Sequence, residues 1–484
     1  RRRVGARPRP GAGTAMLTVL SAAVAVVVVI SLPWWLPARV VALRVRVLTR
    51  INGEESIPVP GDLVGVDRFK EVYSHPAASG RSRGAALSDL FWYWLAPGPE
   101  MHQEHLEAGE RYDAVALATR RVLAVPRTRV EELTRRCVNR ALRDRRGMVR
   151  LRDLVMPVWA EFSYELVFGE PCPPQARDLI VGNADDVVTS LKCCGLRHMD
   201  RRDRLTGYLV ERLSDVRHEL PQGLSAREQA LYLQGAFFNT AVVQMSEATA
   251  HVLMVLAQHP RVQTAARGGD DRYLDQVISE TLRLYPLFGI AHRVTTGEIP
   301  LGDGAAIPAG SVLCFNYPEF HRAGLPDPDR FDPDRFSASS ASQGRPVHPA
   351  RPVHLARPVR EINHIPFGVA ANRPCPAWRL APIALRVAVR ETLHAYELDS
   401  TASHTRSLPN RGPCLLTPLA AGRGPEFHLK LLFMRFRDRW EDVWRSLVQL
   451  VLGTYMVWDA RRLRLCERHF AEDTCPVGVR GHES

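Results

Sequence analysis

The feature that most constrains this chain is an uncharged stretch close to its N-terminal end. Among the 484 residues, none from Gly11 to Ala38 is charged, and the apolar part, Ala15 to Leu36, is 22 residues long. A helix of that length crosses about 30 Å of hydrocarbon, and Trp34 and Trp35 suit a membrane–water interface. The stretch therefore predicts a single-pass membrane anchor. A cleaved signal peptide is the alternative, although its apolar region is normally shorter.

Charges next to this stretch predict its orientation. Arg39, Arg44, Arg46 and Arg50 follow the apolar run, and basic residues gather on the cytoplasmic side of membrane helices. If translation starts at Met16, these arginines hold the rest of the protein on the cytoplasmic side. If the arginines before position 10 belong to the natural chain, the charges on the two sides nearly balance.

Composition narrows the class of protein. Hydrophobic residues make up 45% and charged residues 24%, which is typical of a folded chain and excludes a disordered tail protein, a collagen-like repeat or a small disulfide scaffold. All but three of the 64 basic residues are arginine, which indicates a coding bias behind the formal charge of +12. Because no zinc pattern or RNA-binding aromatic motif occurs, we expect no nucleic-acid partner. Nine cysteines without a CxxC pair indicate a reducing compartment.

The pattern after the anchor is mostly helical. Long amphipathic stretches run from Arg129 to Arg145, from Ala226 to Gln258 and from Asp270 to Leu284. Short strand-like pieces separated by turns occupy Ile299 to Leu313. The fold class is therefore mainly α with a small β portion.

Two segments differ from the helical domain. Residues 337–360 are first rich in serine and then repeat Arg-Pro-Val three times with a period of six, which excludes a helix. We interpret this insert as a surface loop; a basic docking strip is the alternative. Apolar and charged residues alternate at helical spacing from Phe427 to Phe470. This tail predicts two amphipathic helices that pack on the main domain, on a partner or on the membrane surface.

These changes of pattern divide the chain into three parts. We expect an N-terminal basic segment and anchor over 1–49, a main domain over 50–420 and a C-terminal helical extension over 421–484.

One short helical motif predicts a buried ion pair. Glu280 and Arg283 are three residues apart, so they share a helix face and can pair. Apolar neighbours, including Val277 and Leu282, indicate that the helix is buried. A buried ion pair needs further hydrogen bonds, which a second arginine downstream could supply.

A second motif predicts a metal ligand. Cys375 ends a compact loop rich in glycine and alanine and precedes a helix-like run. Amides at a helix N-terminus lower the pKa of a thiol, and Arg373 adds a positive charge. The arrangement suits a soft anionic ligand.

In this order along the chain, the motifs resemble the cytochrome P450 family of haem-thiolate monooxygenases. Glu280-Thr281-Leu282-Arg283 resembles its ExxR motif, Pro333-Asp334-Arg335-Phe336 its arginine-containing element, and Phe367 to Ala377 its cysteine loop. The resemblance covers about residues 50–418. It implies a P450 fold, haem b as cofactor with Cys375 as the iron ligand, and a structural triad of Glu280, Arg283 and Arg335.

The same resemblance implies further cofactor-binding residues. Arg373 and Arg293 fall where the family often places partners of the haem propionates, and Phe367 and Gly368 open the cysteine loop. The loop departs from the family pattern, because Phe367 stands eight rather than seven residues before the cysteine. Alanine also occupies two of the usual glycine positions.

The other side of the haem departs further. The family's central helix carries an acid–threonine pair used in proton delivery, and alignment on Leu256 to Pro260 puts these positions at Val243 and Gln244. Gln244 can hold a relay water because its amide donates and accepts hydrogen bonds; otherwise it is a polar core residue. Thr240, one turn before, and Glu247, about one turn after, are the other catalytic candidates.

Three functions stay open at this level. The first is a monooxygenase that inserts one oxygen atom into a lipophilic small molecule, with electrons from a ferredoxin- or flavin-type partner. The second is a haem-thiolate isomerase, dehydratase or peroxide-using enzyme, which needs no proton relay. The third is a membrane-tethered haem-binding protein without catalysis.

Overall fold

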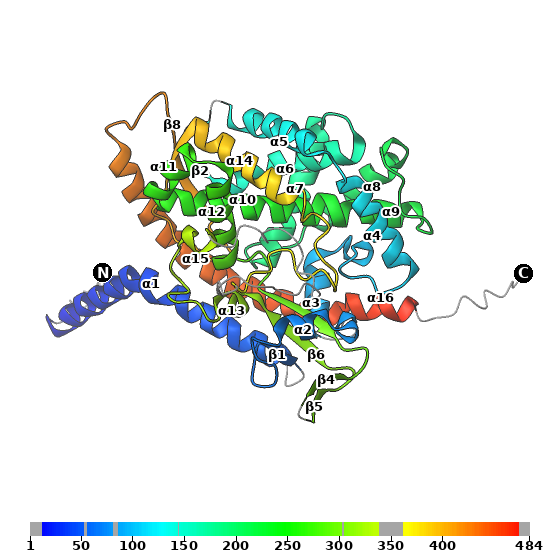
Figure 1. Ribbon diagram of the computed structural model, residues 1–484. Coiled ribbons are helices and arrows are strands. Elements are labelled where there is room, and N and C mark those ends of the chain that lie inside the picture. Colours follow the sequence, from blue (N-terminus) through cyan, green and yellow to red (C-terminus); the bar gives the residue numbers. More distant parts are fainter. Residues whose placement is uncertain are drawn as a thin grey trace, which may run out of the picture.

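The computed structural model describes residues 12–52, 56–80, 86–143, 145–302, 304–337 and 362–473. The chain is mainly helical with three small sheets, in agreement with the expected fold class (Figure 1). Nearly all of the Arg-Pro-Val insert, including the candidate docking strip, lies outside the described residues.

Two long helices form the centre of the core. Helix α6 (Leu151–Phe168) is buried around almost its whole circumference, and it packs along α10 (Val242–Gln258). A helix that is apolar on all sides belongs in the interior of a large domain. Around this pair lie α5 (Arg127–Leu142), α12 (Asp271–Leu284) and α14 (Ala381–Ala395).

The segment that leads into α10 is a π-helix. Helix α9 (Ala226–Leu233) begins with a capping box between Ser225 and Glu228. It continues into a π-helical stretch, Gln234–Ala241, before α10 starts. Such stretches are rare and often occur at functional sites.

The expected strand pieces between Ile299 and Leu313 are confirmed. Strands β4 (Ile299–Gly302) and β5 (Ala305–Ile307) form a hairpin, and β6 (Val312–Asn316) follows it. β6 is the middle strand of a second sheet, parallel to β1 (Ser56–Val59) and antiparallel to β3 (Ile290–Val294).

The third sheet brings distant parts of the chain together. Strand β8 (Pro413–Pro418) is antiparallel to both β2 (Gly147–Arg150) and β7 (Tyr396–Asp399). Seven further α-helices surround the core and the sheets. They are α2 (Phe69–Ser74), α3 (Ala86–Leu95), α4 (Glu110–Leu123), α7 (Pro174–Leu191), α8 (Met199–Glu211), α11 (Pro260–Gly268) and α13 (Tyr317–Arg322).

The N-terminal stretch is helical. Helix α1 (Ala12–Asn52) contains the 26 residues Val19–Arg44, whose length and composition would let it cross a membrane, and its most apolar window is not buried. The stretch Ala226–Gln258 passes the same test but is largely buried as the core helix. Figure 1 shows α1, in dark blue, extending away from the main domain at its N-terminal end.

The tail forms the two expected helices, α15 (Phe427–Leu463) and α16 (Leu465–Asp473). They are separated at Arg464, which has a left-handed backbone with φ of 45°. Helix α15 packs against α1, α3 and β8, while α16 packs against α3. One side of this tail therefore packs on the main domain.

Candidate active site

A largely apolar cavity of about 400 Å³ lies between the central helix and the cysteine loop. Thr240 and Gln244 border it from the π-helix and α10, whereas Phe367 and Cys375 border it from the loop. Phe288 also lines the cavity and is exposed, so the cavity approaches the surface there. A cavity of this size and character can hold a small lipophilic molecule.

The cysteine loop closes on itself. The backbone N–H of Cys375 donates to the carbonyl of Phe367 at 3.0 Å. Gly368 and Arg373 both have left-handed backbones, with φ of 73° and 50°. This conformation suits glycine but is uncommon for a residue with a side chain. The loop therefore holds Phe367, Gly368, Arg373 and Cys375 together at the cavity wall.

A residue that the sequence did not single out fastens the loop. The buried side chain of Asn372 donates from Nδ2 to the carbonyls of Tyr73 and Ala78, at 2.8 and 3.0 Å. These carbonyls lie about 300 residues earlier in the chain. No local pattern could have predicted this contact.

The surroundings of Cys375 shift the pKa of its thiol upward. Burial raises the pKa of Cys375 to about 11, although a hydrogen bond from the backbone N–H of Ala377 lowers it. The expectation of a lowered pKa is therefore wrong for the protein alone, because loss of hydration outweighs one amide. A metal ion at the sulfur would favour the thiolate, and its binding would release a proton.

The structure brings the three residues of the expected triad together. Arg283 donates two hydrogen bonds to Glu280, at 2.7 and 2.8 Å, and both side chains are fully buried. The Arg335 Nε lies 3.5 Å from the Glu280 carboxylate, and the backbone N–H of Asp332 donates to it at 3.1 Å. The carboxylate thus has the further partners that a buried ion pair requires.

The three catalytic candidates of the central helix separate in space. Thr240 and Gln244 line the cavity, but the carboxylate of Glu247 points away from it. Glu247 accepts hydrogen bonds from Arg152 at 2.9 Å and from Lys192 at 2.8 Å. Burial would raise the pKa of Glu247, but these two cations lower it to about 2. The structure therefore brings Thr240 and Gln244, and not Glu247, to the cavity.

Sequence comparison agrees with this geometry. Residues 197–420 match the family model described as Cytochrome P450. The chain belongs to the cytochrome P450 family. Among curated relatives, "Putative cytochrome P450 135B1" of Mycobacterium tuberculosis is 29% identical over 202 residues, which cover 38% of this chain and 39% of that protein. "Cyclooctat-9-en-7-ol 5-monooxygenase" of Streptomyces melanosporofaciens is 33% identical over 126 residues, covering 22% and 27%.

A third curated relative is named as a synthase. Mouse "Thromboxane-A synthase" is 30% identical over 151 residues, which cover 31% of this chain and 25% of that protein. The matched part of this cytochrome P450 thus spans less than half the length of each of these relatives.

Solved structures share the fold of this cytochrome P450. A variant of cytochrome P450 OleT in complex with arachidonic acid has a TM-score of 0.57 at 17% identity, covering 73% of this chain and 87% of the other. Cytochrome P450EX alpha with myristic acid has a TM-score of 0.56 at 18% identity, covering 72% and 87%. At this identity the likeness shows the fold alone.

The residues at the cysteine wall fit haem b, the cysteine-ligated cofactor of this cytochrome P450. Arg293 and Arg373 both line the cavity, so two guanidinium groups are available for two propionates. Arg373 donates to the carbonyls of Gln103 and Leu106, at 2.6 and 2.7 Å. Arg293 pairs with Glu104 at 2.8 Å, and its buried Nε has no hydrogen-bond partner among the described residues. Of these two arginines, Arg293 is thus the one whose Nε–H can still donate a hydrogen bond to a ligand.

A buried polar cluster lies beside Glu247 in this cytochrome P450. His251 and His404 approach to 2.8 Å between ring nitrogens, and both rings stack on Tyr285. Burial lowers the pKa of His251 to about 4 and that of His404 to about 2. Burial also lowers the pKa of Lys192 to about 8, with Glu247 opposing the shift.

These two histidines predict a loss of stability in acid. Below pH 6.5 both histidines take up protons in the unfolded chain but stay neutral in the folded protein. The free energy of unfolding therefore falls as the pH drops from about 6.5 to about 4. The expected slope is about 1.4 kcal/mol per pH unit for each ring. The His404→Phe variant keeps a ring against Tyr285, and we expect a shallower slope in urea unfolding. The same change at His428, which is exposed on α15, should leave the slope as it is; an unchanged slope in His404→Phe would contradict the assignment.

Proposed function

We propose that this cytochrome P450 is a monooxygenase that inserts one oxygen atom from dioxygen into a lipophilic small molecule. The observation that carries the proposal is the largely apolar cavity, bordered by Cys375 from one element and by Thr240 and Gln244 from another. Bound haem b would supply the oxygen activation, favoured by thiolate donation from Cys375. The apolar walls would orient the substrate and exclude water.

Thr240 and Gln244 would position a water molecule and relay a proton in this cavity. They are four residues apart on one continuous helix, so their side chains share a face. The Gln244 amide can donate from Nε2 and accept at Oε1, which positions a water but supplies no proton itself. The hydroxyl of Thr240 can pass a proton from that water through Oγ1.

A specific observation favours a second candidate, an enzyme that uses peroxide or rearranges its substrate without a proton relay. Among the residues by which the π-helix and α10 border the cavity, all of them described, none carries a carboxylate: they are Ala236, Phe237, Thr240, Ala241, Gln244, Met245 and Ala248. The acid one turn further along, Glu247, is engaged by two cations.

The two candidates separate in one experiment on Gln244. We expect Gln244→Leu to lower oxygen- and reductant-driven product formation by about tenfold or more, because the water loses its partners. Peroxide-driven turnover should change little. Myristic and arachidonic acids serve as probe substrates, with a surrogate ferredoxin and its reductase as electron source. Met245→Leu, an apolar change at the same wall, is the control. Turnover with peroxide only, in the unsubstituted protein, would favour the second candidate.

We propose further that a separate ferredoxin or flavin protein supplies the electrons, since the sequence carries no flavin or nicotinamide fingerprint. We propose also that α1 anchors the protein as a single membrane pass with the main domain in the cytoplasm. The apolar run and the arginines after it support this placement.

A further inference from the structure

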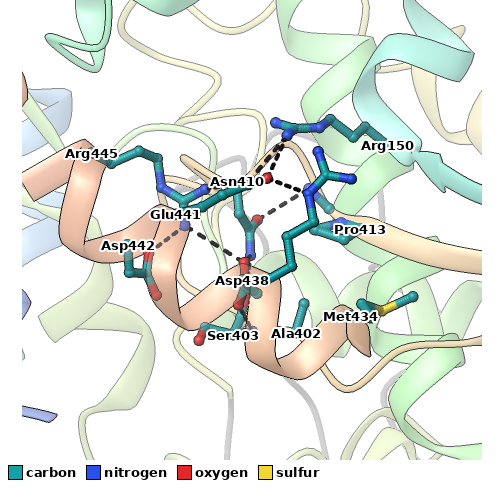
Figure 2. Close-up of polar contacts among 12 residues, drawn as sticks. Arg150, Ala402, Ser403, Asn410, Pro413, Met434, Asp438, Glu441, Asp442 and Arg445 are labelled. Atoms are coloured by element: carbon teal, nitrogen blue, oxygen red, sulfur yellow. Dashed lines mark hydrogen bonds and ion pairs between the residues drawn. The ribbon is translucent and has the colours of Figure 1, made fainter. Parts of the chain in front are cut away.

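Helix α15 is fastened to the main domain by one polar face. Figure 2 shows Asp438 at the centre of this contact, where it accepts hydrogen bonds from the backbone N–H of Ser403 at 2.7 Å and from Asn410 at 3.1 Å. Arg150 donates to Glu441 at 3.0 Å from strand β2 (Figure 2). These contacts fix the rotation of α15 about its own axis.

The opposite face of α15 carries a long apolar stripe. Its C-terminal half is strongly exposed, with exposed fractions of 68% for Trp444, 68% for Val451 and 59% for Trp458. Most members are three or four residues from the next, and Phe436 and Trp444 are eight apart, so all of them lie on one side of the helix. From Leu429 to Trp458 the stripe runs about 44 Å. The exposed members of the stripe are Leu429, Leu432, Phe433, Phe436, Trp444, Leu447, Val451, Tyr455 and Trp458.

Charges on α15 are distributed with the same asymmetry. Its four acidic residues, Asp438, Glu441, Asp442 and Asp459, are all buried or half-buried and paired with arginines. The exposed charged residues of this fully described helix are all basic. They are Lys430, Arg435, Arg437, Arg461 and Arg462. An apolar stripe with basic neighbours is the pattern of a helix that lies in the interface of an anionic membrane.

The candidate anchor runs beside this helix. The Arg439 guanidinium lies 5.4 Å from the centre of the Trp34 ring, and ten residues further along α1 the Arg44 Nε is 3.9 Å from the position that a Cβ on Gly453 would take. The contacts advance together along both helices, so α1 and α15 run in the same direction. The stripe therefore lies next to the segment that would enter the membrane.

We propose that the stripe of α15 binds an anionic lipid surface, beside the part of α1 in which its apolar run ends. The helix cannot cross the membrane, because its other face is tied to the domain through Asp438 and Glu441. Exposed apolar surface of this extent marks an interaction site, and the basic residues beside it match lipid phosphates. Two attachments would fix the orientation of the catalytic domain on the membrane more firmly than one. The proposal rests on the anchoring part of the proposed function and on no catalytic step.

Flotation of the full-length, haem-loaded protein with vesicles tests the proposal. Val26→Arg with Val28→Arg disables membrane insertion of α1 in the intact chain. We expect this variant still to float with vesicles of phosphatidylcholine and phosphatidylglycerol, and less with phosphatidylcholine alone. Adding Trp444→Ser, Val451→Ser and Trp458→Ser should lower the bound-to-free ratio by about tenfold or more.

Matched substitutions control for general loss of surface apolarity. Leu117→Ser with Val210→Ser removes exposed apolar side chains from α4 and α8, and should leave flotation unchanged. An unchanged thermal midpoint shows that each variant is folded. Complete release of the α1 variant, or flotation that is insensitive to the stripe, would overturn the proposal.

A photoreactive residue identifies what covers the stripe. The full chain, without the α1 substitutions, carries p-benzoylphenylalanine in place of Val451. Illumination in the anionic vesicles should then give a lipid adduct that mass spectrometry detects. The same residue at Val210 should give none. A cross-link to a second copy of the chain, or no adduct at Val451, would overturn the lipid assignment. Neither readout depends on turnover, so failure of the monooxygenase proposal would be seen separately.

Discussion

Replacing Cys375 with alanine is expected to abolish the red-shifted absorption band of the reduced, carbon-monoxide-bound protein. That band requires a thiolate on the iron. Among the residues that border the cavity, all of them described, Cys375 is the only cysteine, so no neighbouring thiol can replace it. Turnover should fall below detection, since the thiolate donation that favours oxygen cleavage is lost. Survival of the band in the variant would refute the assignment of Cys375 as ligand.

A second cysteine gives the matched control. Cys172 is half-buried and precedes α7, away from the cavity lining. Cys172→Ala should keep the band and the haem content of the unsubstituted protein. Cys466 is a poorer control because it is buried beside Trp92 and Phe470, where a substitution would disturb the packing of α16. Equal loss of the band in both variants would show general damage instead of loss of a ligand.

Local spacing predicted the parts of the site that are built locally. Glu280 and Arg283 pair because three residues separate them on one helix, and the sequence contains that fact directly. The cysteine loop could be predicted because glycine and proline punctuate it. Pro382 lies in the first turn of α14, which begins at Ala381, where a proline costs the helix no hydrogen bond.

The parts that sequence could not predict depend on contacts between distant segments. Glu247 was a plausible catalytic acid by its position on the helix, yet its direction is decided by Arg152 on α6 and Lys192 after α7. The pKa of Cys375 was misjudged for a related reason. Helix amides are visible in a sequence, but the burial that raises the pKa results from the whole fold.

The stripe of α15 shows a third case. Sequence predicted an amphipathic helix and left its partner open, because the helix has apolar residues on more than one side. Ser403 and Asn410 decide which side faces the domain, and they lie on a segment that no pattern linked to α15. The same contacts turn the second apolar side outward.

The Glu280→Gln substitution is expected to lower the free energy of unfolding by about 3–5 kcal/mol. The carboxylate faces the buried guanidinium of Arg283, lies within 3.5 Å of Arg335, and accepts a hydrogen bond from the Asp332 backbone. A neutral amide leaves the Arg283 charge in the interior without its counter-charge. It also turns an N–H group toward other donors. Because this triad lies between α12 and the segment before the cysteine loop, haem retention should fall together with stability.

An exposed pair of the same chemistry shows how much of this effect comes from burial. Glu219 accepts a hydrogen bond from Arg121 at 2.8 Å, and both side chains are more than half exposed, so Glu219→Gln should cost about 0–1 kcal/mol. Urea unfolding followed by circular dichroism measures both variants. If Glu280→Gln does not yield folded protein, Arg335→Lys keeps a charge near Glu280 and should give a smaller, measurable loss. Equal midpoints for the Glu280 and Glu219 variants would show that the triad contributes no more than a surface pair. In that case the cysteine loop would have to be held by other contacts, of which the Asn372 bonds are the first to test.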